Sequence, residues 1–176
     1  MSFLNIEIKA RTHDPLIARN YLLQHGADFK GTDYQTDTYF NVPKGRLKLR
    51  EGNIETNLIY YERKNDAGPK SSHFHLVKVA DTRNLKNILE ISLGIKTIVK
   101  KEREIYYIDN VKFHIDLVPG LGSFIEIEAG NVLADKTEEE LREQCNFYMN
   151  EIGIEDEYLI PMSYSDMLLN ESAINE

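Results

Sequence analysis

Residues 124–128 read Phe-Ile-Glu-Ile-Glu, and this short stretch contains the pattern that decides the fold. Apolar and charged residues alternate in it with a period of two. Because successive side chains of a β-strand point to opposite faces, Glu126 and Glu128 share one face while the apolar residues share the other. The stretch therefore predicts a strand with one charged face and one apolar face.

The same alternation recurs along the chain. It is found in Asn5-Ile6-Glu7-Ile8-Lys9, in Leu47-Lys48-Leu49-Arg50, and around Lys101, Arg103 and Asp116. A single strand of this kind is ordinary in an antiparallel sheet whose charged face meets water. Recurrence in at least four segments, with acids and bases in separate groups, is better explained by a barrel with a charged interior. Such an interior suits the binding of a polyanion and of the metal ions that accompany it.

Eight strands and four helices are predicted around this pattern. The strands are expected at about residues 3–11, 35–41, 46–51, 57–64, 73–79, 97–108, 111–118 and 123–129. Helices are expected from Asp14-Pro15 to Gly26, over 82–93, from the capping box Thr137–Glu140 to Gly153, and near Ser163. Hairpin-like connections favour an α+β fold, an eight-stranded antiparallel β-barrel with helices packed outside. We expect one domain over 1–176, with a barrel core at about 3–129 and C-terminal helices at about 137–170.

Composition excludes several classes of function. The chain has 176 residues, 41% of them hydrophobic, and a net charge of −8, so a broad nucleic-acid-binding surface is not expected. Cys145 is the one cysteine, which rules out an internal disulfide and fits a packing role in a reducing compartment. The sequence has no apolar run long enough to cross a membrane and no signal peptide pattern. A cytoplasmic protein without membrane partners is therefore expected.

Several motifs together resemble the CYTH superfamily, the triphosphate tunnel enzymes. Asn5-x-Glu7-x-Lys9 is close to the Glu-x-Glu-x-Lys signature of that superfamily, and residues 35–40, 45–51 and 113–128 resemble its class IV adenylyl cyclase branch. The resemblance extends from residue 5 to about residue 168. It implies an eight-stranded tunnel that binds a nucleoside or inorganic triphosphate with Mg²⁺ or Mn²⁺, and a homodimer. Members include adenylyl cyclases, thiamine triphosphatases and inorganic triphosphatases.

The resemblance also suggests roles for individual residues. Carboxylate oxygens suit Mg²⁺ or Mn²⁺, and the expected metal ligands are Glu7, Asp116, Glu126 and Glu128. Arginine forks and lysine ammonium groups suit phosphate, and the expected triphosphate-binding residues are Lys9, Lys48, Arg50, Arg63, Lys101 and Arg103. The expected catalytic residues are Glu7, Lys9 and Asp116. Further candidates are Asn5, Arg46 at the tunnel mouth, and His114, which shares a strand face with Asp116.

The expected activity is that of a class IV adenylyl cyclase, which converts ATP to 3′,5′-cyclic AMP and pyrophosphate. The alternatives are a triphosphatase of the same fold, acting on inorganic, thiamine or nucleoside triphosphate, and a non-catalytic triphosphate- or polyphosphate-binding module. Asn5 favours the last of these, because it replaces the first acid of the signature and an amide brings no negative charge to a metal site.

Overall fold

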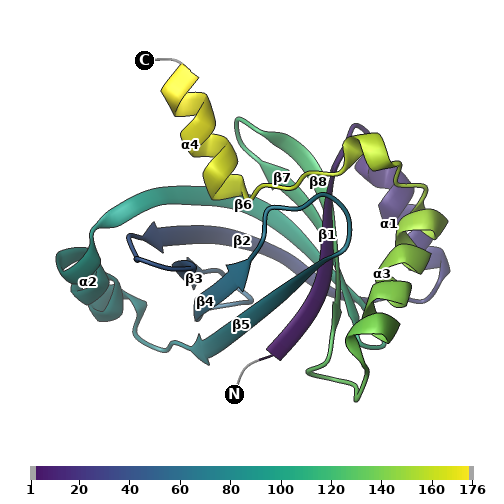
Figure 1. The fold of residues 1–176 in the computed structure, drawn as a ribbon, viewed down its shortest axis with the longest axis horizontal. Helices are drawn as coiled ribbons and strands as arrows, with labels where there is room; N and C mark the ends of the chain where they lie inside the picture. Colours follow the sequence, from purple (N-terminus) through teal and green to yellow (C-terminus); the bar gives the residue numbers. More distant parts are fainter. Residues whose placement is uncertain (1–2, 175–176) are drawn as a thin grey trace.

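A closed antiparallel barrel forms the body of the protein in the computed structural model, which describes residues 3–174 (Figure 1). Around the barrel the strands follow one another in the order β1-β5-β4-β3-β2-β6-β7-β8. Their bounds are β1 Phe3–Thr12, β2 Asp28–Phe40, β3 Arg46–Glu51, β4 Asn57–Arg63, β5 Lys70–Lys78, β6 Ile95–Ile108, β7 Val111–Val118 and β8 Gly122–Gly130. The predicted fold class, an α+β eight-stranded barrel, is confirmed.

Helices lie outside the barrel (Figure 1). They are α1 Pro15–Gln24, α2 Thr82–Leu93, α3 Glu138–Ile152 and α4 Tyr164–Ile174, with a short 3₁₀ turn at Asp156–Tyr158. Asp14 caps α1 and the complete capping box of Thr137 and Glu140 starts α3, as the sequence predicts, and Asp81 caps α2, which the sequence analysis did not identify.

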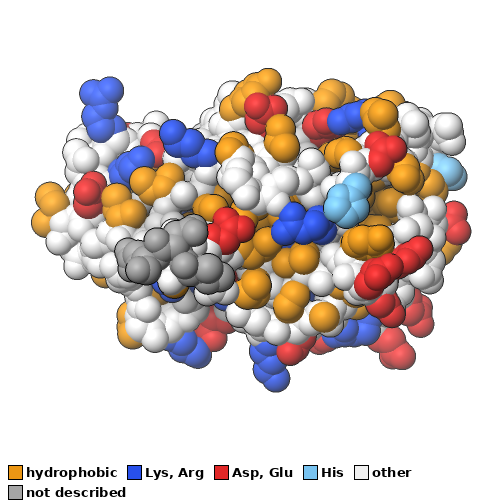
Figure 2. All heavy atoms as spheres, turned by 90° about the horizontal axis from the view of Figure 1, so that it is seen from above, with side chains coloured by type: hydrophobic (Ala, Val, Ile, Leu, Met, Phe, Trp, Pro, Cys, Tyr) orange, Lys and Arg blue, Asp and Glu red, His pale blue; other side chains and the backbone are white. Residues whose placement is uncertain are grey.

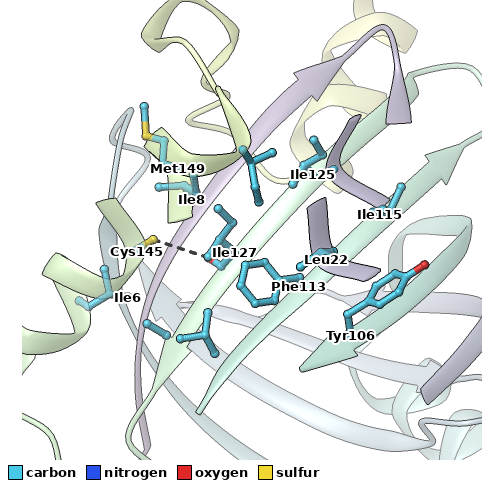
Figure 3. Close-up of a cluster of buried hydrophobic side chains, with 14 of the residues drawn as sticks. Ile6, Ile8, Leu22, Tyr106, Phe113, Ile115, Ile125, Ile127, Cys145 and Met149 are labelled. Carbon is cyan, nitrogen blue, oxygen red and sulfur yellow. Dashed lines mark hydrogen bonds between the residues drawn. The ribbon is translucent and has the colours of Figure 1, made fainter. Parts of the chain in front are cut away.

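The main hydrophobic core lies between the outer wall of the barrel and helices α1 and α3. Figure 3 shows Ile6 and Ile8 of β1 and Ile125 and Ile127 of β8 in this core, together with Cys145 of α3. Because neighbouring side chains on a strand point to opposite faces, covering the apolar face with helices turns the charged face into the barrel. The helices therefore explain why the charged residues line the interior.

Strand β2 is longer than the sequence predicts. It begins at Asp28, whereas the polar segment before residue 35 gave no strand signal. Its register with β6 shifts between Phe29 and Gly31, where Gly31 has a φ of 119°. Asp33 is fully buried in this extension because it binds a loop inside the barrel. Strand β5 likewise begins at Lys70, inside the predicted loop.

The two ends of the barrel differ. At one end a second apolar cluster joins Tyr39, Val99 and Phe124 to Tyr164 and Met167 of α4, which stands over this end in Figure 1. At the other end lie the start of β1 and the end of β5, and the lining residues there are more exposed. We call these the α4 end and the open end.

The outer surface is mixed in character. In Figure 2, which looks onto the molecule from the α4 side, basic, acidic and hydrophobic side chains are interspersed on the visible face. Among residues 3–174 no helix has the length and apolar character needed to span a membrane.

Candidate active site

A cavity of about 760 Å³ occupies the barrel interior. Most of the predicted site residues line it, namely Asn5, Glu7, Lys9, Lys48, Arg50, Arg63, Lys101, Arg103, His114, Glu126 and Glu128. Asp116 and Arg46 do not. The period-two pattern therefore brings together side chains from six different strands, which no local stretch of sequence contains.

A single buried carboxylate organises three of the bases. Asp37 on β2 is fully buried and accepts hydrogen bonds from Lys48 Nζ, from Lys101 Nζ and from Nε and Nη2 of Arg50, each at 2.9 Å. Burial opposes ionisation of Asp37, but Arg50 and the two lysines hold its pKa well below the usual range. The carboxylate thus fixes the directions of three cationic side chains around the cavity.

Asp116 lies behind Arg103 and not among the other predicted metal ligands. Its Oδ1 accepts from Arg103 Nε at 2.7 Å, and its Oδ2 accepts from Arg103 Nη2 at 2.5 Å and from the Tyr164 hydroxyl at 2.7 Å. The carboxylate is 1% exposed, and both of its oxygens are occupied by protein donors. The sequence does not predict this pairing, because a shared strand face does not tell which side chain reaches the cavity and which is covered by a neighbouring strand.

Arg46 also differs from the prediction. Instead of lining the mouth of the main cavity, its Nη2 donates to Asp166 on α4 at 2.7 Å and to Asn65 at 3.1 Å. The residue therefore ties α4 to the barrel at the α4 end, where only a minor pocket is found.

Arg63 presents donors that the described protein does not use. Its Nη1 binds Glu7, whereas Nε and Nη2 are buried and have no hydrogen-bond partner within residues 3–174. In Arg50 the corresponding Nε and Nη2 donate to Asp37, and in Arg103 they donate to Asp116. Buried donors are almost always paired, so the two unpaired nitrogens of Arg63 are unusual among the described residues.

Three possible metal-ligating groups meet on strands β7 and β8. Ligand atoms of His114, Glu126 and Glu128 all lie within 4.8 Å of one another. His114 Nδ1 is 3.2 Å from Glu126 Oε2, and burial together with Arg103 lowers the pKa of this imidazole to about 3, so it stays neutral at pH 7. A neutral imidazole with two carboxylates is a donor set that suits Mn²⁺ or Mg²⁺.

Glu7 adds a third carboxylate beside this set. It pairs directly with Glu128 across β1 and β8, and burial together with the Glu7 charge raises the pKa of Glu128 to about 7. A bound cation would relieve this repulsion. The residues present therefore fit a divalent ion, held by Glu126, Glu128 and His114 with Glu7 beside them.

Sequence reasoning missed three residues of the cavity. Lys112 could have been found, because it shares a strand face with His114 and Asp116. Glu55 lies in an irregular connection, and Tyr164 lies at the start of α4, so neither carries a periodic signal. Tyr164 closes the α4 end of the cavity, where its ring centroid lies 3.7 Å from Lys9 Nζ.

The buried ammonium of Lys101 predicts a proton-linked binding step. Burial, partly offset by Asp37, lowers the pKa of Lys101 to about 7, so this side chain is largely neutral in the free protein at pH 8. A bound polyanion favours the charged form, and tripolyphosphate binding at pH 8 should therefore take up a proton. Calorimetry in buffers of different ionisation enthalpy measures this uptake. In Lys101→Arg, which is permanently charged, the proton uptake should be smaller than in the native protein; equal uptake would contradict the assignment.

Asn5 lies at the edge of the acidic group. Its Nδ2 is 3.5 Å from Glu128 Oε2, so a carboxylate at this position would join Glu7 and Glu128. We expect Asn5→Glu to lower the melting temperature without metal, through added repulsion, and to show a larger rise with Mn²⁺ than the native protein does. Thermal scans with and without Mn²⁺ test this, with Asn5→Gln as the uncharged control. If Asn5→Glu gains no more from Mn²⁺ than that control, Asn5 lies outside the metal shell.

Comparisons with known proteins agree with this geometry. The closed antiparallel barrel encloses a cavity lined by bases and carboxylates, which is a tunnel-type architecture. The CYTH domain model matches residues 4–164, and the chain belongs to the CYTH domain family.

Similar proteins cover almost the whole chain. A Methanocaldococcus jannaschii protein named "Putative adenylate cyclase" is 26% identical over an alignment of 173 residues, which covers 93% of this chain and 98% of that protein. The structure of the PH1012 protein from Pyrococcus horikoshii has a TM-score of 0.80 at 24% identity, covering 92% of this chain and 98% of that one. A Vibrio parahaemolyticus structure described as a "putative adenylate cyclase" has a TM-score of 0.77 at 15% identity, covering 94% and 97%. The two structural likenesses show the fold.

Proposed function

We propose that this protein is a divalent-metal-dependent enzyme that binds a triphosphate inside the barrel, and that its reaction is the conversion of ATP to 3′,5′-cyclic AMP and pyrophosphate. The observation that carries the proposal is the Arg63 guanidinium: the residue lines the cavity beside Lys9 and Glu7, and its buried Nε and Nη2 have no hydrogen-bond partner among residues 3–174. A rotation of this side chain that turns Nε and Nη2 to the cavity would let two phosphate oxygens satisfy both donors. The sequence relative named as an adenylate cyclase supports the same reading.

The order of groups along the cavity supports reaction at the α-phosphorus. Lys9 lies against Tyr164 at the α4 end, whereas Glu7 and Glu128 lie one step nearer the open end on β1 and β8. A triphosphate that enters with its terminal phosphate first would have its α-phosphate nearest these two carboxylates. The ribose 3′-hydroxyl would then attack the α-phosphorus and give its proton to one of these carboxylates, while the bond from the α-phosphorus to the bridging oxygen breaks and pyrophosphate leaves.

The chain's own residues would stabilise charge during this step. The side chains of Lys9, Arg63 and Arg103 are largely buried in the barrel, where they would stabilise the negative charge of the leaving pyrophosphate more strongly than in bulk water. A bound Mg²⁺ or Mn²⁺ supplies Lewis acidity at the phosphoryl oxygens. Asp116 acts as a positioning residue, since it touches Arg103 and not the cavity.

A triphosphatase is the second candidate because Glu126 lies nearer the α4 end of the cavity than Glu128 does. Its Oε1 is 3.1 Å from Lys9 Nζ and its Oε2 is 2.7 Å from Arg103 Nη2, so a carboxylate also lies near the expected position of the terminal phosphate. Water would then attack the terminal phosphorus and release orthophosphate.

Product analysis separates these functions. The purified protein is incubated with ATP, and separately with tripolyphosphate, in Mg²⁺ or Mn²⁺. Cyclic AMP with pyrophosphate is the expected result, whereas orthophosphate would identify a triphosphatase. Tight binding of both ligands with no product would identify a binding module and overturn the enzymatic proposal.

A further inference from the structure

A carboxylate inside the cavity bridges two basic side chains. Glu55 lies in the connection between β3 and β4, and its Oε2 accepts from Arg50 Nη1 at 3.0 Å while its Oε1 accepts from Lys112 Nζ. Arg50 belongs to β3 and Lys112 to β7, and these strands are separated in the barrel by β2 and β6. The carboxylate therefore spans the interior between strands that are not neighbours.

The connection that carries Glu55 is held firmly in place. Buried Asp33 accepts from the backbone N–H of Ile54 at 2.8 Å and of Glu55 at 3.0 Å. A Cβ at Gly52 would lie 2.5 Å from Asp33 Oδ1, so only glycine allows this close approach. Glu55 is thus positioned by its backbone and does not depend on a flexible surface loop.

Glu55 separates two chemically different parts of the cavity. Toward the α4 end lie the bases that suit phosphate. Toward the open end the wall is apolar, where Phe3 and Phe74 pair across β1 and β5 with ring centroids 5.6 Å apart and Leu76 follows. Among the described lining residues Lys78 is the one cation beyond Glu55, and it is exposed at the rim, where solvent screens its charge.

We propose that Glu55 limits the length of the bound phosphate chain, so that the cavity selects a triphosphate attached to an uncharged organic group over longer polyphosphates. The proposal rests on the proposed function. The carboxylate neutralises Arg50 and Lys112, which would otherwise extend the basic zone toward the open end. A fourth phosphate would meet this negative charge and then an apolar wall, whereas an organic group would contact that wall favourably.

Binding of three ligands tests the proposal: ATP, tripolyphosphate and tetrapolyphosphate, titrated by calorimetry at constant ionic strength without divalent ions. In the native protein ATP and tripolyphosphate should bind at least about tenfold tighter than tetrapolyphosphate, given the strength of like-charge repulsion in a partly buried site. Glu55→Gln should improve tetrapolyphosphate binding most and remove most of this preference. Glu55→Ala gives the same comparison with a shorter side chain, and a melting curve shows that each variant is folded.

Glu51→Gln is the matched control. Glu51 ends β3 just before the same connection, but it pairs with Lys86 of α2 outside the cavity. Its removal should leave the preference unchanged. If Glu55→Gln strengthens binding of all three ligands by the same factor, or if the native protein shows no preference, Glu55 does not read chain length. If the native protein binds none of the ligands, and still binds none of them when Mn²⁺ is added, the proposed function itself fails.

Discussion

Arg63→Lys is expected to weaken tripolyphosphate binding by at least about 100-fold while the protein remains folded. Lysine keeps a positive charge near Glu7 but cannot offer the two parallel donors, Nε and Nη2, that have no partner in the native arginine among residues 3–174. Each hydrogen bond to a charged group contributes about 1.5–3 kcal/mol, so loss of a two-bond contact accounts for the expected change.

Calorimetry of the native and variant proteins at equal ionic strength measures this effect. Arg19→Lys is the matched control, because Arg19 makes a similar two-bond contact with Glu104 on the outer wall of the barrel. Its substitution should leave tripolyphosphate affinity unchanged. Equal affinities of native and Arg63→Lys proteins would show that the free guanidinium edge is not the phosphate site.

Replacing both Glu126 and Glu128 by glutamine should reduce Mn²⁺ affinity by about 100-fold or more. Even residues that only orient metal ligands change metal affinity by about 10–100-fold when they are substituted, and here two proposed ligands lose their charge. The two positions differ in structural cost. Glu126 pairs with Lys9 and Arg103, whereas Glu128 meets only Asn5 at 3.5 Å and His114 at 3.7 Å among the described contacts.

Glu128→Gln alone should therefore lower Mn²⁺ affinity without lowering the melting temperature, since it also removes repulsion from Glu7. Isothermal titration with Mn²⁺, in the absence of any triphosphate, gives the affinity. Glu102→Gln, an exposed acid on β6, is the control for a simple change of net charge. Unaltered Mn²⁺ binding in the double variant would show that Glu126 and Glu128 of β8 are not the metal ligands.

Local sequence patterns were sufficient for most of each strand and for most of the charged residues that line the cavity. Period-two alternation at Glu7 and Lys9, and at Glu126 and Glu128, correctly predicts strands. It also groups charged side chains on one face, and the barrel turns that face inward. The caps at Asp14 and Thr137 are local hydrogen bonds between residues near in sequence, so they too are readable from the chain.

The positions of Asp116, Arg46 and Glu55 depended on long-range contacts. Asp116 and Arg46 lie on well-predicted strands, but segment 163–166, which is distant in sequence, supplies Tyr164 and Asp166 as their partners. Glu55 enters the cavity because Asp33, in a part of β2 without a strand signal, binds its backbone.

The alternation of apolar and charged residues predicts the strands and the residue types on each of their faces, because the period of a strand is a local property of the backbone. Which of the inward-facing charges are already paired depends on contacts between segments that are distant in sequence. Arg50 donates to Asp37 and Arg103 donates to Asp116, whereas Nε and Nη2 of Arg63 have no hydrogen-bond partner among residues 3–174. The physical reason is that a hydrogen bond depends on the distance and direction between two groups, and the packing of distant strands and α4 sets both.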